Sequence, residues 1–336
     1  MNINTNRLLR AFMALLWMWG YANAWAGTVG FQEQTTYDER GQVLKLAIWY
    51  PTSSPVQTVS LGWTTQDLAM EGTMAGGKHP LILISHGTGG TYLSHYDTAV
   101  ALAQAGFIAA AVLHPGDNAL DQSRRLFILE RPAHVRRALD YLQQQWRDHE
   151  QIDDDRIGIF GFSAGGFTAL VNIGGKPDMG SIAPFCLQHP RHFACQLIAQ
   201  ETAPGQAATM PLPERQEQDA RIKAAVIAAP ALGFTFANRL QGVSVPVQLW
   251  RAEDDQILPH PWYAEEVLRA LPPTPQYHVV LHAGHFDFLA PCSPMMAQRL
   301  PEICNSAPGF DRTNFHRHFN EEVVAFFRQT LVKRDD

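Results

Sequence analysis

One serine in the sequence has the neighbours that a nucleophile of acyl-transfer chemistry needs. Ser163 lies between Gly161 and Gly165 in the pattern G-x-S-x-G, after the apolar run 157–160 and before the helix-compatible run 167–171. A sharp turn from strand to helix requires glycines there, because side chains would collide as the serine is raised above the edge of the sheet. A glycine-rich surface turn is the alternative interpretation. The position between strand and helix favours the nucleophile.

Two later residues are candidates for the partners of this serine. A serine hydroxyl is a weak nucleophile near neutral pH, so it needs a base, and the base needs a carboxylate that orients it. Asp255 and His285 each follow a predicted strand, in the order Ser, Asp, His. Asp254 is the second candidate for the acid, and a solvated acidic loop is the alternative to both. His282, which still belongs to a strand end, is the second candidate for the base.

Two backbone amides are predicted to stabilise the oxyanion of acyl transfer, where one donor is typically worth about 3 to 4 kcal/mol. The first belongs to Ala164, the residue after the serine and at the positive end of the following helix. The second is expected in the glycine-rich segment 85–90, where we choose Thr88. A plain turn is the alternative there. A phosphate-binding loop is disfavoured, because no Lys-Ser or Lys-Thr follows the glycines.

Alternating strands and helices are predicted to hold these residues. Short continuous apolar runs are typical of central parallel strands that are covered on both faces, and runs with helical spacing separate them. The predicted strands are 80–85, 107–113, 156–160, 224–229, 245–251 and 276–281, and the predicted helices are 92–105, 131–146, 262–271 and 315–332. This alternation predicts an α/β fold with a doubly wound, mostly parallel sheet.

Three regions depart from this alternation. The ranges 28–36 and 43–50 alternate apolar and polar residues, which predicts an antiparallel pair at the edge of the sheet. The range 53–77 has mixed polarity and no clear period, so it is predicted to be a long loop with at most a short helix. The range 173–219 contains Gly, Pro, Gln and two Cys and is far longer than a compact βαβ loop. We interpret it as an insertion over the sheet, after the helix that follows the serine.

The first 26 residues have the composition of a signal peptide. Arg7 and Arg10 precede an apolar run over 11–19, and Ala24 and Ala26 fit an A-x-A cleavage site. An uncleaved membrane anchor is the alternative, but the run is shorter than the roughly 20 residues of a spanning helix. We expect a signal peptide over residues 1–26, one domain over residues 27–336, no membrane span after cleavage, and a periplasmic or secreted protein.

Four cysteines lie in the predicted mature chain and form two pairs that are close in sequence. In an oxidising compartment, an even number of locally paired cysteines predicts disulfides, here Cys186–Cys195 and Cys292–Cys304. Zinc binding is the competing interpretation. It is weaker, because neither pair has the short C-x₂₋₄-C spacing of a structural zinc site. No metal and no cofactor are therefore expected.

The residues described so far resemble the α/β-hydrolases that include bacterial platelet-activating-factor acetylhydrolase-like proteins and predicted dienelactone hydrolases. The similar segments are 47–51, 85–90, 114–118, 161–166 and 283–289. The resemblance implies the α/β-hydrolase fold and a triad that falls on Ser163, Asp255 and His285. One departure is chemical: true dienelactone hydrolases use a cysteine nucleophile, so Ser163 points away from that substrate.

These observations predict an exported serine hydrolase that cleaves carboxylic esters of small molecules through an acyl-enzyme. A serine peptidase, amidase or thioesterase on the same fold is the alternative, and a non-catalytic exported binding protein is a further one. Loss of the signal peptide removes two positive charges and changes the net charge from −6 to −8. A mildly acidic chain without a Lys/Arg cluster argues against nucleic acid or an anionic membrane as partner. The oligomeric state and the acyl-chain length are left open.

Overall fold

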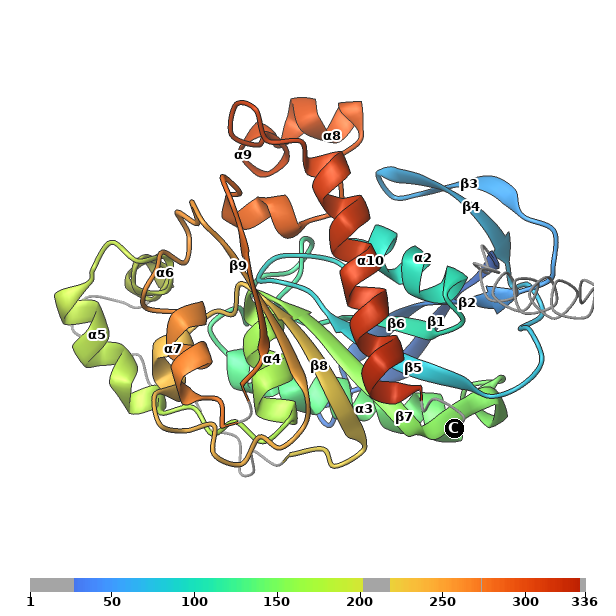
Figure 1. Ribbon diagram of the computed structural model, residues 1–336, viewed down its shortest axis with the longest axis horizontal. Helices are drawn as coiled ribbons and strands as arrows, with labels where there is room; N and C mark the ends of the chain where they lie inside the picture. Colours follow the sequence, from blue (N-terminus) through green and yellow to red (C-terminus); the bar gives the residue numbers. More distant parts are fainter. Residues whose placement is uncertain (1–26, 202–217, 273, 333–336) are drawn as a thin grey trace, which may run out of the picture.

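The computed structural model describes residues 27–201, 218–272 and 274–332, so the predicted signal peptide lies outside the described residues. In this part of the chain the strands are β1 (Thr28–Tyr37), β2 (Val43–Thr52), β3 (Gln57–Leu61), β4 (Thr64–Met70), β5 (His79–Ser85), β6 (Ile108–Leu113), β7 (Ile152–Phe162), β8 (Ile222–Ala228), β9 (Val247–Ala252) and β10 (Gln276–Val280). They form one sheet in the order β10-β9-β8-β7-β5-β6-β2-β1-β4-β3 (Figure 1). The six strands from β10 to β6 in that order run parallel, as predicted.

Helices cover both faces of this sheet. The described α-helices are α2 (Tyr96–Gln104), α3 (Arg131–Gln144), α4 (Ala164–Asn172), α5 (Ile182–Gln188), α6 (Phe193–Glu201), α7 (Ala264–Ala270), α8 (Pro294–Arg299), α9 (Pro301–Cys304) and α10 (Arg312–Leu331). Short 3₁₀ helices are η1 (Ile128–Glu130), η2 (His149–Gln151), η3 (Met179–Ser181), η4 (Gly233–Phe236) and η5 (His285–Phe288).

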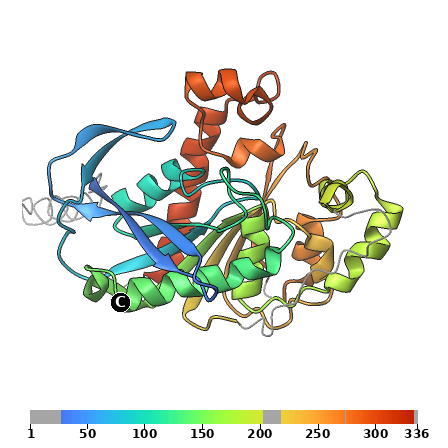
Figure 2. The ribbon, with the colours of Figure 1, turned by 180° about the vertical axis from the view of Figure 1, so that it is seen from behind.

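Successive side chains of a strand point to opposite faces, and the central strands show this directly. In β5, Leu81 and Leu83 belong to one core, whereas Ile82 and Ile84 belong to the other. Helices α3, α4 and α7 cover the first core, and α2 and α10 cover the second. Figure 1 looks onto the side of α10, and Figure 2 shows the opposite side with α3 in front. Burial on both faces explains why these strands are continuous apolar runs.

The range 53–77 is not the long loop that its mixed polarity predicts. Strands β3 and β4 form an antiparallel hairpin there, with Gly62 and Trp63 between the paired residues Leu61 and Thr64. Gly62 has φ +55°, which glycine adopts without strain. The apolar pattern fails in β3 because its residues are exposed or half-buried, so neither of its faces needs an apolar row.

The hairpin also corrects the predicted position of the first strand pair. Strands β1 and β2 pair antiparallel along their full length, as predicted. They are not at the edge of the sheet, because β4 pairs with β1 in parallel through Gly30 and Phe31. The true edges of the sheet are β3 and β10.

Two segments that interrupt the alternation of strands and helices carry disulfides. Cys186 and Cys195 join α5 to α6 in the region between α4 and β8, and Cys292 and Cys304 join the start of the α8 segment to the end of α9. Both disulfides agree with the pairing that the sequence predicts. Residues 202–217 of the proposed insertion 173–219 lie outside the described residues. None of the described helices is both long enough and apolar enough to cross a membrane.

Candidate active site

Ser163 occupies the turn between β7 and α4. Its backbone has φ 54° and ψ −116°, a conformation that residues with side chains adopt only where the surroundings enforce it. Both flanking positions require glycine, because backbone carbonyl groups approach them too closely for a side chain. A Cβ on Gly161 would lie 2.1 Å from the carbonyl oxygen of Gly165, and a Cβ on Gly165 would lie 1.8 Å from that of Ser85. The turn thus depends on the glycines of the sequence motif.

The structure brings the serine together with both predicted partners. His285 Nε2 lies 3.1 Å from Ser163 Oγ, and His285 Nδ1 lies 2.7 Å from Asp255 Oδ2. A carboxylate can only accept, so Nδ1 carries the ring proton and Nε2 is free to accept the hydroxyl proton. All three side chains are nearly buried. The arrangement can remove a proton from the serine and hold the resulting imidazolium.

Strand topology explains why these distant residues meet. Ser163, Asp255 and His285 follow β7, β9 and β10, whose carboxyl ends lie at the same edge of the parallel sheet. Asp255 is fixed further, because its Oδ1 accepts the N–H groups of Ile257 and Leu258 at 3.0 and 2.7 Å. The second candidates, Asp254 and His282, are exposed side chains.

Both predicted oxyanion donors lie beside the serine. Ala164 is the first residue of α4, where a backbone N–H has no acceptor within its own helix. Thr88 lies in the loop after β5 and lines the same hollow as Ser163. The Thr88 N–H shares a planar peptide group with the Gly87 carbonyl, so whatever holds that carbonyl also aims the amide.

A buried ion pair holds this peptide group. The Arg131 guanidinium donates to the carbonyls of His86 and Gly87 at 2.7 and 3.2 Å. Arg131 Nε lies 2.9 Å from Asp117 Oδ2, and Asp117 Oδ1 accepts the N–H of Gly89 at 2.9 Å. The side chains of the pair are only 2% and 4% exposed. The loop around Thr88 is therefore fixed from both sides by charge-assisted bonds.

Histidines complete what we call the Arg131 network, which comprises Ser85, His86, His114, Asp117, Arg131 and His134. Ser85 Oγ lies 2.8 Å from His114 Nε2, and His114 Nδ1 lies 3.3 Å from His134 Nδ1. Burial, and then the neighbouring Arg131 charge, hold the pKa values of His86 and His114 well below the usual range. Burial lowers the pKa of His134 to about 4, despite the opposing charge of Asp38. These rings are neutral hydrogen-bonding groups at physiological pH.

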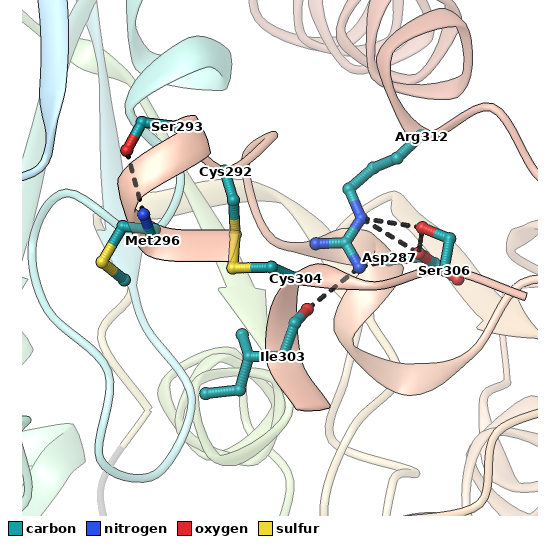
Figure 3. The surroundings of a disulfide bond; sticks show 8 residues. All are labelled: Asp287, Cys292, Ser293, Met296, Ile303, Cys304, Ser306 and Arg312. Atoms are coloured by element: carbon teal, nitrogen blue, oxygen red, sulfur yellow. Dashed lines mark hydrogen bonds and ion pairs between the residues drawn. A yellow bond between two sulfur atoms is a disulfide. The ribbon is translucent and has the colours of Figure 1, made fainter. Parts of the chain in front are cut away.

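A second network lies behind His285, and we call it the Arg312 network; its members are Asp97, Asp287, Ser306, Arg312 and His316. Figure 3 shows its centre, where the Arg312 guanidinium contacts Asp287 Oδ1 at 2.9 Å and the Ile303 carbonyl at 3.0 Å. Asp287 Oδ2 accepts the N–H of Gly284 at 2.7 Å. This bond fixes the peptide group between Ala283 and Gly284, one residue before His285.

A charged histidine joins this network to α2. His316 Nδ1 lies 2.7 Å from Asp97 Oδ2, and His316 Nε2 donates to the carbonyl of Asp287 at 2.8 Å. Burial alone would lower the pKa of His316, but the Asp97 carboxylate raises it above the usual range. The pKa of Asp97 is lowered, because His316 outweighs the effect of burial.

Sequence reasoning missed the charged residues of the two networks around Ser163, Asp255 and His285. Asp117 and Asp287 lie in segments 114–118 and 283–289, which carry the family resemblance, yet no role was predicted for either. Their partners Arg131 and Arg312 lie 14 and 25 residues further along the chain. Only the fold brings each pair together, so no spacing rule could have indicated them.

One group in the described part of the chain has the side-chain types of a metal site. Ligand atoms of Glu253, Asp254 and His282 lie within 4.8 Å of one another. Asp254 and His282 are exposed, and Glu253 already accepts the backbone N–H of His282 at 2.9 Å. Exposed acidic groups of this kind are common without a metal, so we assign none.

Comparisons with known proteins show the fold of the chain. No protein-family model matches it, and no curated protein matches it significantly. Among solved structures, it is similar to a ferulic acid esterase from Streptomyces cinnamoneus, with 18% sequence identity and a TM-score of 0.64. The alignment covers 94% of this chain and 94% of that esterase. At this identity the similarity concerns the fold, and function has to be argued from the site.

Proposed function

We propose that the protein is an exported serine hydrolase that cleaves carboxylic esters of small molecules. One observation carries the proposal: His285 bridges Ser163 Oγ at 3.1 Å and Asp255 Oδ2 at 2.7 Å, in a nearly buried site. The structural neighbour is a ferulic acid esterase, which supports the same reaction class. No step of the proposed reaction requires a metal or a cofactor.

The reaction follows from the geometry in two halves. Ser163 Oγ attacks the ester carbonyl carbon while its proton moves to His285 Nε2. The bond from the carbonyl carbon to the alcohol oxygen then breaks, His285 gives its proton to the departing oxygen, and the acyl group stays on the serine. A water molecule next gives a proton to His285 and attacks the acyl-enzyme. The acid leaves, and the serine regains its proton.

The negative oxygen in each half-reaction needs donors that are already oriented. We assign this role to the backbone amides of Ala164 and Thr88. The dipole of α4 favours negative charge near Ala164. The Arg131 network supports the role of Thr88, because it holds the Gly87 carbonyl and therefore the direction of the neighbouring N–H.

Replacement of the nucleophile tests the proposal most directly. The variant Ser163→Ala should lose kcat on p-nitrophenyl esters by a factor on the order of 10⁶, as in a serine triad that acts as a unit. A fluorophosphonate probe should label the wild-type protein on Ser163 and leave this variant unlabelled. The matched control is Ser60→Ala on the exposed strand β3, which should behave as wild type.

Two other outcomes would replace the proposal with one of its alternatives. Faster turnover of an amide than of its matched ester would assign the site to a peptidase or amidase. Absence of both labelling and turnover in a folded wild-type protein would favour a binding protein on the same fold. A thioester tested beside its oxygen ester separates thioesterase from esterase activity.

Export belongs to the same proposal and has its own test. The two disulfides support an oxidising compartment, where such bonds persist. Expression of the full chain should yield a periplasmic or secreted protein whose N-terminal sequence begins near Gly27. Full-length protein retained inside the cell would contradict export without affecting the proposed chemistry.

A further inference from the structure

A hollow beside Ser163 is lined almost entirely by apolar side chains. It has a volume of about 550 Å³, including the part that is open to solvent. Its apolar lining comes from several elements, among them Leu126, Ile182, Leu197, Leu232 and Leu258. A site that buries a small ligand is typically concave and apolar with few polar groups, and this hollow has that character.

The position of the hollow relative to the triad indicates which half of an ester it receives. It is lined by Ser163 and Thr88, whereas His285 is not among its lining residues. In the proposed reaction the departing alcohol oxygen takes its proton from His285, so the alcohol must lie on the side of that ring. The acyl group, which stays bonded to Ser163, therefore lies on the side of the hollow.

Part of the lining of the hollow belongs to the segment α5–α6, which carries the disulfide Cys186–Cys195. Helix α6 contributes Leu197, which is 9% exposed, and Cys195 on the same helix is joined to Cys186. Helix α5 is held against the body of the protein by Phe185, whose ring stacks on Phe234 with centroids 3.7 Å apart. The segment thus contributes apolar side chains to the hollow beside the serine.

One charged residue lines the hollow. The Arg125 guanidinium contacts the carboxylate of Glu201 and donates to Gln122 Oε1 at 2.9 Å, so its charge is already balanced. Arg125 Nε is buried and has no acceptor among the described residues. Because this N–H could donate to a carboxylate, an acyl group that ends in a carboxylate is the competing occupant of the hollow. The experiment below therefore includes such an ester.

On these grounds we infer that the hollow is an acyl site for uncharged aliphatic chains longer than acetyl. The inference rests on the proposed function and names its substrate class. Burial of one methylene is worth about 0.8 kcal/mol, which corresponds to about a fourfold gain in kcat/KM. Two added methylenes should therefore raise kcat/KM by about fifteenfold from an acetate to a butyrate ester of the same alcohol.

The test compares a series of p-nitrophenyl esters on two matched variants. Leu197→Trp fills the hollow and should lower kcat/KM for the hexanoate at least about tenfold, while the acetate changes by less than about threefold. Leu187→Trp places the same side chain at an 86% exposed position of α5 and should leave the whole series unchanged. A hemisuccinate ester, which carries the charged end, should be cleaved more slowly than the butyrate.

Each contrary result has a separate meaning. Equal kcat/KM from acetate to hexanoate, equal losses on both esters in Leu197→Trp, or preference for the hemisuccinate would overturn the acyl-site inference. In all three cases the esters are still cleaved, so the proposed function survives. Failure of every ester, together with an absence of probe labelling at Ser163, would instead overturn the proposed function itself.

Discussion

Two buried networks flank the proposed triad, and each fixes a backbone peptide group near it in a different way. The Arg131 network orients the peptide between Gly87 and Thr88 by donating to its carbonyl, whereas the Arg312 network orients the peptide between Ala283 and Gly284, one residue before His285, by accepting its N–H. The first is built around neutral histidines. The second contains a histidine whose pKa is raised by Asp97. Fixed peptide groups are thus common to both networks, whereas the charge state of the histidines in them differs.

The surroundings of the two networks also differ. Arg131 begins α3, a helix with seven buried residues that covers the first core. Arg312 likewise begins a helix with core side chains, α10, but it also donates to the Ile303 carbonyl on α9, and neither α8 nor α9 buries any residue. A segment without core side chains cannot hold its backbone by packing alone. The disulfide between Cys292 and Cys304 supplies the missing constraint there.

The largest effect is expected from Asp117→Asn in the Arg131 network. The change leaves the Arg131 charge buried without its counter-charge, which should cost about 3 to 5 kcal/mol of folding stability. Release of the loop should lower kcat on the order of 10²-fold with little change in KM, because a donor to the oxyanion is misplaced. Steady-state kinetics below the unfolding midpoint and urea titration measure the two quantities.

A second readout separates this positioning role from general destabilisation. A trifluoromethyl ketone forms a tetrahedral adduct with the serine, so its affinity should weaken in step with kcat. Asp121→Asn is the matched control, since Asp121 is exposed and lies four residues from Asp117 in the sequence. A destabilised Asp117→Asn protein with normal kcat and normal inhibitor affinity would show that the network only supports the fold.

A smaller effect is expected from removing the covalent tie of the Arg312 network. The double variant Cys292→Ser/Cys304→Ser should lose about 3 kcal/mol of stability and several-fold in kcat, because Ile303 and its bond to Arg312 are no longer fixed. The disulfide Cys186–Cys195 closes a loop of similar length, so the matched variant Cys186→Ser/Cys195→Ser should lose similar stability. Its kcat on the acetate ester should be retained, and only its preference among acyl chains should change. Equal losses of kcat on the acetate ester in both variants would show that the two disulfide-bonded segments do not differ in their effect on the site.

Order along the chain was enough to predict which residues meet at the candidate active site. Ser163, Asp255 and His285 were predictable because each follows a strand, and parallel strands bring their carboxyl ends to one edge. Sequence reasoning missed the hairpin β3–β4, because β3 is exposed or half-buried and two of the buried residues of β4, Thr64 and Gln66, are polar. It also missed Arg131 and Arg312, because a buried arginine has the same sequence context as an exposed one until the fold provides its partner.

The smallest effects concern the pH dependence of stability. The two networks should change the free energy of unfolding on opposite sides of pH 6.5. The pKa of His134 is lowered from 6.5 to about 4, so the unfolded chain binds the extra proton first as pH falls. Its contribution to stability is present above pH 6.5 and is lost as pH falls through about 4. The pKa of His316 is raised above 6.5, so its contribution is present below pH 6.5 and is lost as pH rises through the folded-state value.

Two substitutions separate the contributions of His134 and His316 to the slope of the free energy of unfolding against pH. A single proton changes the free energy of unfolding by at most about 1.4 kcal/mol per pH unit. His134→Gln should make this free energy fall less steeply between pH 6.5 and about 4. His316→Gln should leave that range unchanged and remove part of the fall above pH 6.5. Urea unfolding with the disulfides intact measures both slopes independently of the absolute loss of stability in either variant. If both variants changed the pH dependence of stability on the same side of pH 6.5, the two networks would not differ in the charge state of their histidines.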